Sequence, residues 1–231
     1  MLNSKKILEL FKQLTKYDTP TICNALEILD PKCQIKGYTK KEFFCLNPSL
    51  PPMIGYVRTA KIFSNDKNRH ITSAERTEYY RYMEKGNLPK ICVIEDSNKN
   101  PTGCFWGEVQ TNIHQNLGFK GVITNGSIRD LDDVAKNFQM LARSVLPSHS
   151  YIELKSIGKS VKICGEQFKH NDIVHADQHG AVIIPPKYLD KLLLAIKQVV
   201  KNEKPILDLC KNNKFSLKKL ENILNKKNKY H

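Results

Sequence analysis

Helical and strand-like hydrophobic patterns alternate along this chain, and that alternation limits its fold more than any other feature of the sequence. In EVQTNIHQNLG, apolar residues recur every four positions, at Val109, Ile113 and Leu117, and Gly118 supplies a helix C-cap. The apolar segment GVITNG then predicts a short buried strand. Because helices and strands continue to alternate, we predict an α/β fold, with an extra β layer from the strand-rich second half.

Other segments extend the same pattern. Residues 4–16 have helical spacing of apolar positions, and Thr19 followed by Pro20 predicts the start of a second helix, which Pro31 ends. The remaining predictions are strands over 54–63 and 90–96, a polar helical excursion over 64–90, a turn with a helical piece over 129–137, a strand over 142–147, short strands over 151–183, a helix over 187–201 and a basic helix after Ser216.

The length of 231 residues allows one sizeable hydrophobic core, and no low-complexity linker divides the chain. We therefore expect a single domain over residues 1–231, with helical N- and C-terminal extensions. The N-terminal segment has no uninterrupted apolar run, so we expect neither a signal peptide nor a membrane span. Seven cysteines without a CxxC pair indicate reduced thiols and thus a cytoplasmic protein, without disulfides or structural zinc.

The net charge of +14 is concentrated towards the C-terminus, because residues 187–231 hold twelve lysines against four acidic residues and thereby +8 of the total. Lysine-rich solvated helices are the simplest interpretation of such a tail. Binding of nucleic acid or of an acidic protein partner through this tail is the alternative. Aromatic residues are not interleaved with the lysines, which weakens the case for single-stranded nucleic-acid binding.

Common motifs for nucleotide binding, zinc proteases and serine hydrolases are absent from the sequence. The strongest candidate site joins Glu108, at a helix start, with the pair Arg129 and Asp130, because the twenty residues between them suffice for one helix and one strand that return the chain. Arg129 would clamp an anion, and Asp130 would supply oxygen ligands for Mg²⁺ or Mn²⁺. Backbone N–H groups at the helix start would bind a carboxylate: those of Gly107, Glu108, Val109 and Gln110.

Other interpretations of the polar residues stay open. Arg129 and Asp130 are equally well explained as a surface ion pair that caps the following helical piece. The segment HADQH would place His175, Asp177 and His179 on one face of a strand, a pattern found among metal ligands. A structural role for this segment is the alternative to metal binding.

Three segments together resemble the RraA-like family, which includes the class II 4-hydroxy-4-methyl-2-oxoglutarate/oxaloacetate aldolases. The segment YDTPTICNALE is similar to the family's opening motif, GEVQTNIHQNLGFKGVITNGSIRDLDDV to its central segment, and HNDIVHADQHGAVIIPP to its closing strand. The resemblance covers roughly residues 17–186 and leaves 187–231 as a basic helical extension. It implies a swivelling β/β/α-type layered fold, assembly as a homotrimer or homohexamer with sites between subunits, and a divalent metal.

The resemblance also implies roles for individual residues. In the aldolases, the arginine that matches Arg129 binds the pyruvoyl group and the aspartate that matches Asp130 holds the metal. The loop that matches Gly107 to Gln110 binds the substrate carboxylate through its backbone. The residue that matches Glu108 is Asp in those enzymes, where it positions a water for proton transfer, and typically Gly in the regulator of ribonuclease E. Glu108 keeps the carboxylate and adds a methylene, which leaves catalysis feasible and the substrate open.

We therefore predict a metal-dependent carbon–carbon lyase that cleaves or decarboxylates a 2-oxo acid to give pyruvate. The metal would act as Lewis acid, Arg129 would lie beside the enolate oxygen, and Glu108 would return a proton. One alternative is a non-catalytic regulatory protein of the ribonuclease E regulator type. Another is RNA binding by residues 187–231. A regulator has no need of a carboxylate at position 108, which favours the enzyme.

Overall fold

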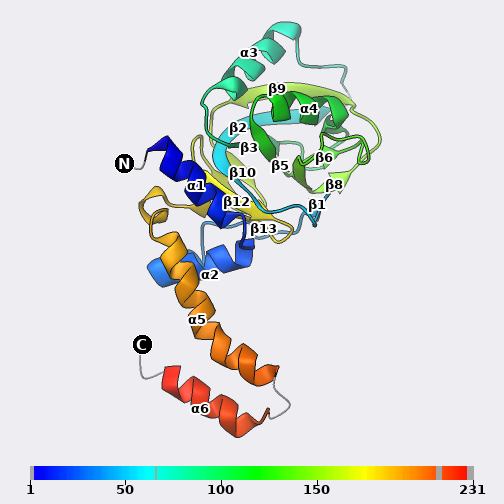
Figure 1. Cartoon of the computed structure of the whole chain (residues 1–231). Coiled ribbons are helices and arrows are strands. Elements are labelled where there is room, and N and C mark those ends of the chain that lie inside the picture. Colours follow the sequence, from blue (N-terminus) through cyan, green and yellow to red (C-terminus); the bar gives the residue numbers. More distant parts are fainter. Residues whose placement is uncertain (1–2, 66, 212–214, 228–231) are drawn as a thin grey trace.

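The computed structural model describes residues 3–65, 67–211 and 215–227, and it shows helices packed around one large, strongly curved sheet (Figure 1). The strands of this sheet follow the order β1-β7-β5-β3-β2-β12-β13, and β9 also pairs with β2. The predicted α/β class is thus confirmed. The bounds are β1 Phe44–Cys45, β2 Met53–Asn65, β3 Lys90–Asp96, β5 Phe119–Thr124, β7 Gln139–Ala142, β9 Tyr151–Ile157, β12 Ile173–Asp177 and β13 Gly180–Ile184.

Two smaller sheets lie beside the large one. One is a parallel sheet of three short strands, β4 Cys104–Trp106, β6 Ser127–Ile128 and β8 Ser144–Val145. The other is an antiparallel hairpin formed by β10 Val161–Ile163 and β11 Glu166–Phe168. The β10–β11 hairpin, which packs against the large sheet, is the extra β layer predicted from the strand-rich second half.

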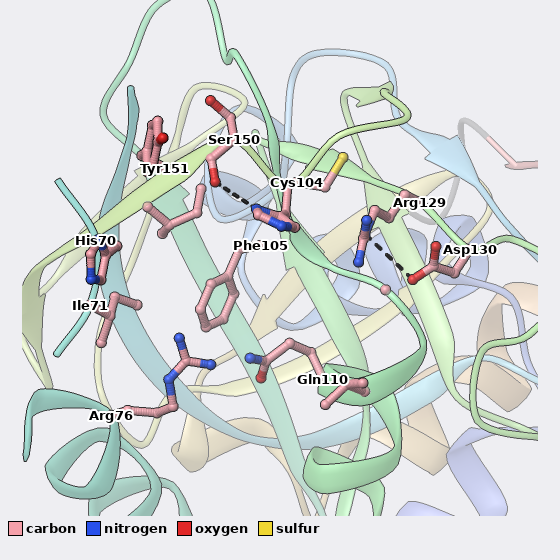
Figure 2. A pocket seen from close by; sticks show the side chains of 14 residues that line it. His70, Ile71, Arg76, Cys104, Phe105, Gln110, Arg129, Asp130, Ser150 and Tyr151 are labelled. Atoms are coloured by element: carbon pink, nitrogen blue, oxygen red, sulfur yellow. Dashed lines mark hydrogen bonds and ion pairs between the residues drawn. The ribbon is translucent and has the colours of Figure 1, made fainter. Parts of the chain in front are cut away.

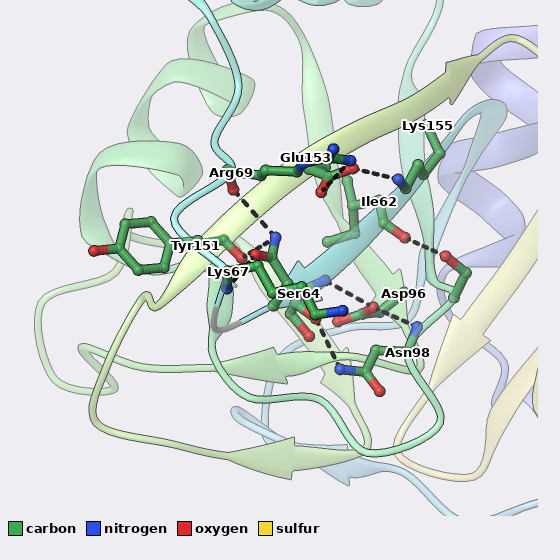
Figure 3. Close-up of polar contacts among 11 residues, drawn as sticks. Ile62, Ser64, Lys67, Arg69, Asp96, Asn98, Tyr151, Glu153 and Lys155 are labelled. Carbon is green, nitrogen blue, oxygen red and sulfur yellow. Dashed lines mark hydrogen bonds and ion pairs between the residues drawn. The ribbon is translucent and has the colours of Figure 1, made fainter.

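Strand β2 organises the large sheet because it pairs with three other strands. It runs parallel to β3 over most of its length, its first part pairs antiparallel with β12, and its last part pairs antiparallel with β9. Where β2 and β3 end, the buried carboxylate of Asp96 accepts N–H groups of Ser64 at 3.2 Å and Asn98 at 2.9 Å (Figure 3). The Asn65 amide donates to the carbonyl of Tyr151 at 3.3 Å, which fixes the start of β9 against β2.

The central parallel strands are buried on both faces, as their continuous apolar runs require. Along β3, Cys92 and Ile94 point into the core below α3 and α4, whereas Ile91 and Val93 point into the core covered by the β10–β11 hairpin. A third core lies between β12, β13 and the terminal helices. The helices are α1 Ser4–Leu14, α2 Thr19–Leu29, α3 Ser73–Glu84, α4 Glu108–Asn116, α5 Leu192–Cys210 and α6 Leu217–Lys227.

Two element predictions are wrong. Residues 129–137 contain turns and no helix. The backbone N–H of Ala135 donates to Thr111 Oγ1 at 3.0 Å, so it does not form the hydrogen bond to a carbonyl group that a helix requires. The predicted strand over 142–147 is reduced to β8, and β7 precedes it, with Arg143 between the two.

The C-terminal helices also differ from the sequence pattern. The helix predicted over 187–201 begins later, after a short 3₁₀ turn at Pro186–Tyr188, and continues through Pro205 to Cys210. Helix α5 packs against α2 with Leu192 and Ile196 fully buried, then leaves the body of the molecule, and α6 folds back beside it (Figure 1). Within the described residues, no helix combines the length and the hydropathy that a membrane-spanning segment requires.

Candidate functional site

The candidate site lies where two neighbouring strands of the small parallel sheet end. Trp106 of β4 is paired with Ile128 of β6, and the N–H of Arg129 donates to the carbonyl of Trp106 at 3.0 Å. The chain that leaves β4 starts α4, and the chain that leaves β6 forms the Arg129–Asp130 pair. Because parallel strands end at the same edge of a sheet, the start of α4 and the Arg129–Asp130 pair meet there, as predicted from the sequence.

Asp130 is held against the start of α4. Its Oδ2 accepts the backbone N–H of Glu108 at 3.1 Å and lies 3.5 Å from Nε of Arg129. A Cβ atom on Gly107 would come within 2.3 Å of that oxygen, so only glycine allows this approach. Asp130 itself has φ 55°, a left-handed conformation that aspartate tolerates better than most residues.

The N-terminus of α4 retains two donors for an anion. The N–H of Glu108 is taken by Asp130, and the N–H of Thr111 bonds to the carbonyl of Gly107 at 3.0 Å as the first helical hydrogen bond. The N–H groups of Val109 and Gln110 have no protein partner in the part of the chain that the structure describes. They point out of the helix end, where its dipole favours negative charge.

A cavity of about 450 Å³ opens over this end of α4 (Figure 2). Five of the six predicted site residues line it, and the sixth, Glu108, does not: its side chain is exposed to solvent outside the cavity. Asp130 is the only carboxylate among the lining residues. Sequence reasoning missed several others that contribute side chains: His70, Arg76, Phe105, His149 and Tyr151.

Two of these missed residues, His70 and Arg76, come from the polar segment that precedes β3, and the others come from β4 and from the start of β9. Arg76 lies in the first turn of α3, which begins with a capping box between Thr72 and Glu75. The sequence pattern T-x-x-E at this point would have located the helix start. It would not have located the cavity, because α3 and α4 approach each other only in the folded chain.

His114 connects these two helices beneath the cavity. It is fully buried, and desolvation lowers its pKa to about 4, so its ring is neutral at neutral pH. Nδ1 donates to the carbonyl of Gln110 at 2.8 Å, so Nε2 accepts from the hydroxyl of Tyr79, also at 2.8 Å. His114 therefore joins α4 to α3 and has no access to a ligand.

The HADQH segment does not form a metal site. His175 and Asp177 lie in β12, but His179 lies in the following turn, so the three side chains do not share a strand face. Oδ2 of Asp177 accepts the N–H of Thr19 at 2.7 Å, and Nδ1 of His175 lies 3.0 Å from the hydroxyl of Thr19. These contacts fix the start of α2 against the sheet. Nowhere among the described residues do three His, Cys, Asp or Glu side chains gather as metal ligands would.

The donor set of the cavity fits a hydrated hard cation. The Asp130 side chain is 32% exposed, and its second oxygen has no protein partner among the described residues. Mg²⁺ in enzymes commonly keeps several waters and uses one or two carboxylates together with the substrate. A zinc site needs three or four protein ligands, and the described residues of this cavity bring no such set together.

Comparisons with known proteins agree with this architecture. A family model described as RraA-like, Aldolase/RraA, matches residues 19–183. An uncharacterized protein from Methanocaldococcus jannaschii is 27% identical over 103 residues, which are 44% of this chain and 50% of that protein. The match thus spans about half the length of this relative.

Solved structures share the fold at low sequence identity. A structure from a group of novel cellulases of gut-associated microbes has a TM-score of 0.71 and 18% identity and covers 88% of this chain and 87% of its own. Streptomyces coelicolor RraAS2, an unusual member of the RNase ES inhibitor RraA family, has a TM-score of 0.65 and 19% identity, with 88% and 96% covered. Similarity at this level establishes the fold alone.

Proposed function

Because this chain belongs to the RraA-like family, we propose that it is a metal-dependent carbon–carbon lyase that cleaves or decarboxylates a 2-oxo acid and releases pyruvate. The family match and the solved neighbours confirm the predicted resemblance and the predicted RraA-like layered fold. The family includes aldolases and decarboxylases as well as non-catalytic ribonuclease E inhibitors. The choice between them therefore depends on the site of this chain.

One observation supports the enzyme: Arg129 and Asp130 lie at the cavity beside the free N–H groups of Val109 and Gln110. The two N–H groups would bind the carboxylate of a 2-oxo acid. The Arg129 guanidinium would bind the neighbouring 2-oxo oxygen, where negative charge develops when the adjacent carbon–carbon bond breaks. This set of donors suits an enolate better than it suits a neutral ligand.

A divalent cation, Mg²⁺ or Mn²⁺, would be held by the free oxygen of Asp130 and, when bound, would supply Lewis-acid stabilisation of the enolate. The hydrogen bond from the Glu108 N–H orients the Asp130 carboxylate, and Gly107 leaves it the necessary space. Arg129 would have two functions, binding the substrate oxygen and orienting the Asp130 carboxylate, whose Oδ2 lies 3.5 Å from its Nε.

Glu108 would return a proton to the carbon that loses its substituent. Its exposed carboxylate lies outside the cavity lining, so this transfer would need a water molecule or a different rotamer. We propose assembly as a homotrimer or homohexamer, as the family resemblance implies. A neighbouring subunit would then be able to cover the exposed start of α4.

The test is pyruvate release from oxaloacetate, coupled to lactate dehydrogenase, in Mg²⁺ and in EDTA, with metal-only blanks for spontaneous decarboxylation. We expect metal-dependent turnover that falls at least about 100-fold in both Arg129→Gln and Asp130→Asn. Asp132→Asn, an exposed acidic residue two positions away, is the matched control and should keep full activity. Turnover that survives both substitutions would show that the reaction does not occur at this pair.

A regulatory protein of the ribonuclease E inhibitor type is the second candidate, because Glu108 lies outside the cavity and the lysine-rich α5–α6 pair projects from the body. This function predicts inhibition of a purified ribonuclease E without any turnover of 2-oxo acids. Inhibition that persists in Asp130→Asn would separate it from the lyase.

A further inference from the structure

A second cavity, of about 430 Å³, lies at the amino ends of the parallel strands β2, β3, β5 and β7. These strand starts bring Met53, Pro89, Lys120 and Gln139 to its lining, and α1 forms one wall. It shares no lining residue with the cavity over α4. The second cavity is therefore separate from the candidate site, and its volume is in the range of small-molecule sites.

Helix α1 is a fixed wall that lies outside the family match, which begins at residue 19. Leu14 is fully buried in the core that α1 shares with β12, β13 and α5. The ring of Phe11 lies 5.8 Å from the ring of Tyr56. Leu8, in contrast, lines the cavity and is 44% exposed. Core packing thus holds α1 in place and leaves the Leu8 side chain available for contact with a ligand.

Apolar groups continue along the loop before β2, which contributes Leu50, Pro51 and Pro52 to the lining. The two prolines are conformationally stiff and bring no N–H donor. The polar side chain of Gln139 is already engaged, because its Nε2 donates to the carbonyl of Asn47 at 2.7 Å and its Oε1 accepts the Asn47 N–H at 3.3 Å. This part of the wall therefore offers a ligand mainly apolar contact.

Two positive charges border the apolar wall, and none of the described residues that line it is acidic. The charges are those of Lys12 on α1 and Lys120 on β5, and neither ammonium group has a hydrogen-bond or ion-pair partner in the described part of the chain. Glu9 does not compensate them, since it lies outside the lining and its Oε1 accepts the amide of Gln13 at 2.9 Å. The cavity thus combines an apolar wall with uncompensated positive charge, which attracts an anionic group.

We propose that this cavity binds an anionic amphiphile of the medium-chain fatty-acid class. The carboxylate pairs with the ammonium groups of Lys12 and Lys120, and the acyl chain lies against Leu8 and the loop 50–52. Ion pairs near solvent contribute modestly, so most of the affinity comes from burial of the chain, about 3-fold for each buried methylene. The same two lysines repel a cationic amphiphile. This site goes beyond the proposed lyase function and does not depend on it.

The experiment is isothermal titration of the full chain at neutral pH with decanoate, octanoate and octylamine, each below its critical micelle concentration. We expect decanoate to bind about 10-fold more tightly than octanoate, and octylamine at least about 10-fold more weakly than octanoate. Replacing both lysines, by Lys12→Gln and Lys120→Gln in one protein, should weaken decanoate binding about 10-fold, and Leu8→Asp should weaken it at least as much. Lys5→Gln, an exposed lysine of α1 outside the cavity lining, is the matched control.

Several results would overturn this site: no binding of decanoate, equal binding of octanoate and octylamine, or unchanged affinity in Leu8→Asp. Arg129→Gln should bind decanoate as wild type does, and a loss of binding there would place the fatty acid in the cavity over α4 instead. A smaller sedimenting mass of Leu8→Asp, with no decanoate binding to wild type, would show that a second copy of the chain occupies the cavity. Thermal unfolding of each variant shows whether a loss of binding comes from a loss of fold.

Discussion

Acidification should destabilise this protein through its buried histidines, of which His114 is the clearest. Burial lowers its pKa from 6.5 to about 4. Between pH 4 and pH 6.5, the His114 side chain is therefore protonated in the unfolded chain and neutral in the folded chain. The stabilising contribution of neutral His114 is therefore complete above pH 6.5 and is lost as the pH falls towards 4. At pH 5, about 1.5 pKa units below the unfolded value, the loss is about 2 kcal/mol.

The measurement is equilibrium urea unfolding of wild type and His114→Gln at pH 7 and pH 5, at one protein concentration because subunit association adds to stability. His114→Gln should be less stable at pH 7, since it loses the bonds to Tyr79 and Gln110. Its loss of unfolding free energy between pH 7 and 5 should be about 2 kcal/mol smaller than that of wild type.

A matched variant, His149→Gln, removes an exposed histidine and should retain the wild-type pH dependence. Equal pH dependence in wild type and His114→Gln would refute the reasoning, because it would mean that His114 binds its proton equally well in both states. His175, also buried with a pKa of about 4, should add a loss of similar size to the pH dependence of every variant that keeps it.

Three further predictions address the site, the fold and the C-terminal helices. Gly107→Ala places a methyl group 2.3 Å from Oδ2 of Asp130. The pyruvate-release assay should therefore show a loss of about 100-fold in kcat. Full activity would show that the position of this carboxylate is unimportant. Lys90→Met should lower the free energy of unfolding in urea by about 3 kcal/mol, because the buried ammonium donates to three carbonyl groups at the end of α3, at 2.9, 2.9 and 3.4 Å. An unchanged unfolding midpoint would contradict this. Truncation after Cys210 should leave the melting temperature nearly unchanged, whereas truncation after Pro186 should unfold the protein, since it removes α5 from its core contacts with α2.

The helix and strand over residues 108–124 were predictable because their signals are local. The spacing of Val109, Ile113 and Leu117 and the glycine after them specify α4 before any tertiary contact forms. The proximity of Glu108 to the Arg129–Asp130 pair was also predicted, because the twenty residues between them suffice for one helix and one returning strand. The assignment of catalytic roles to Glu108, Arg129 and Asp130 stays a prediction.

The missed features depend on contacts between distant segments. LDDVAKN has a helix-forming composition, yet the Thr111 hydroxyl accepts the N–H of Ala135 and the Gln115 amide donates to the carbonyl of Lys136, so α4 holds this loop in turns. Likewise, no pattern in α3 shows that Arg76 lines the same cavity as Gln110, because the Tyr80–Gln110 contact exists only after packing. The basic C-terminal segment illustrates the same limit, since the first half of its helix belongs to the core.

The shared pairing of β2 has a consequence for how the chain folds. Its first part pairs with β12, so that Tyr56 is opposite Ile173, and its last part pairs with β9, so that Asn65 is opposite Tyr151. Both pairings close long loops, and topologies dominated by such non-local contacts fold slowly. During synthesis, β2 can bind β3 early, but its other edge stays open until most of the chain has left the ribosome. That unpaired edge is the surface at which aggregation competes with folding, so refolding yield should fall as protein concentration rises.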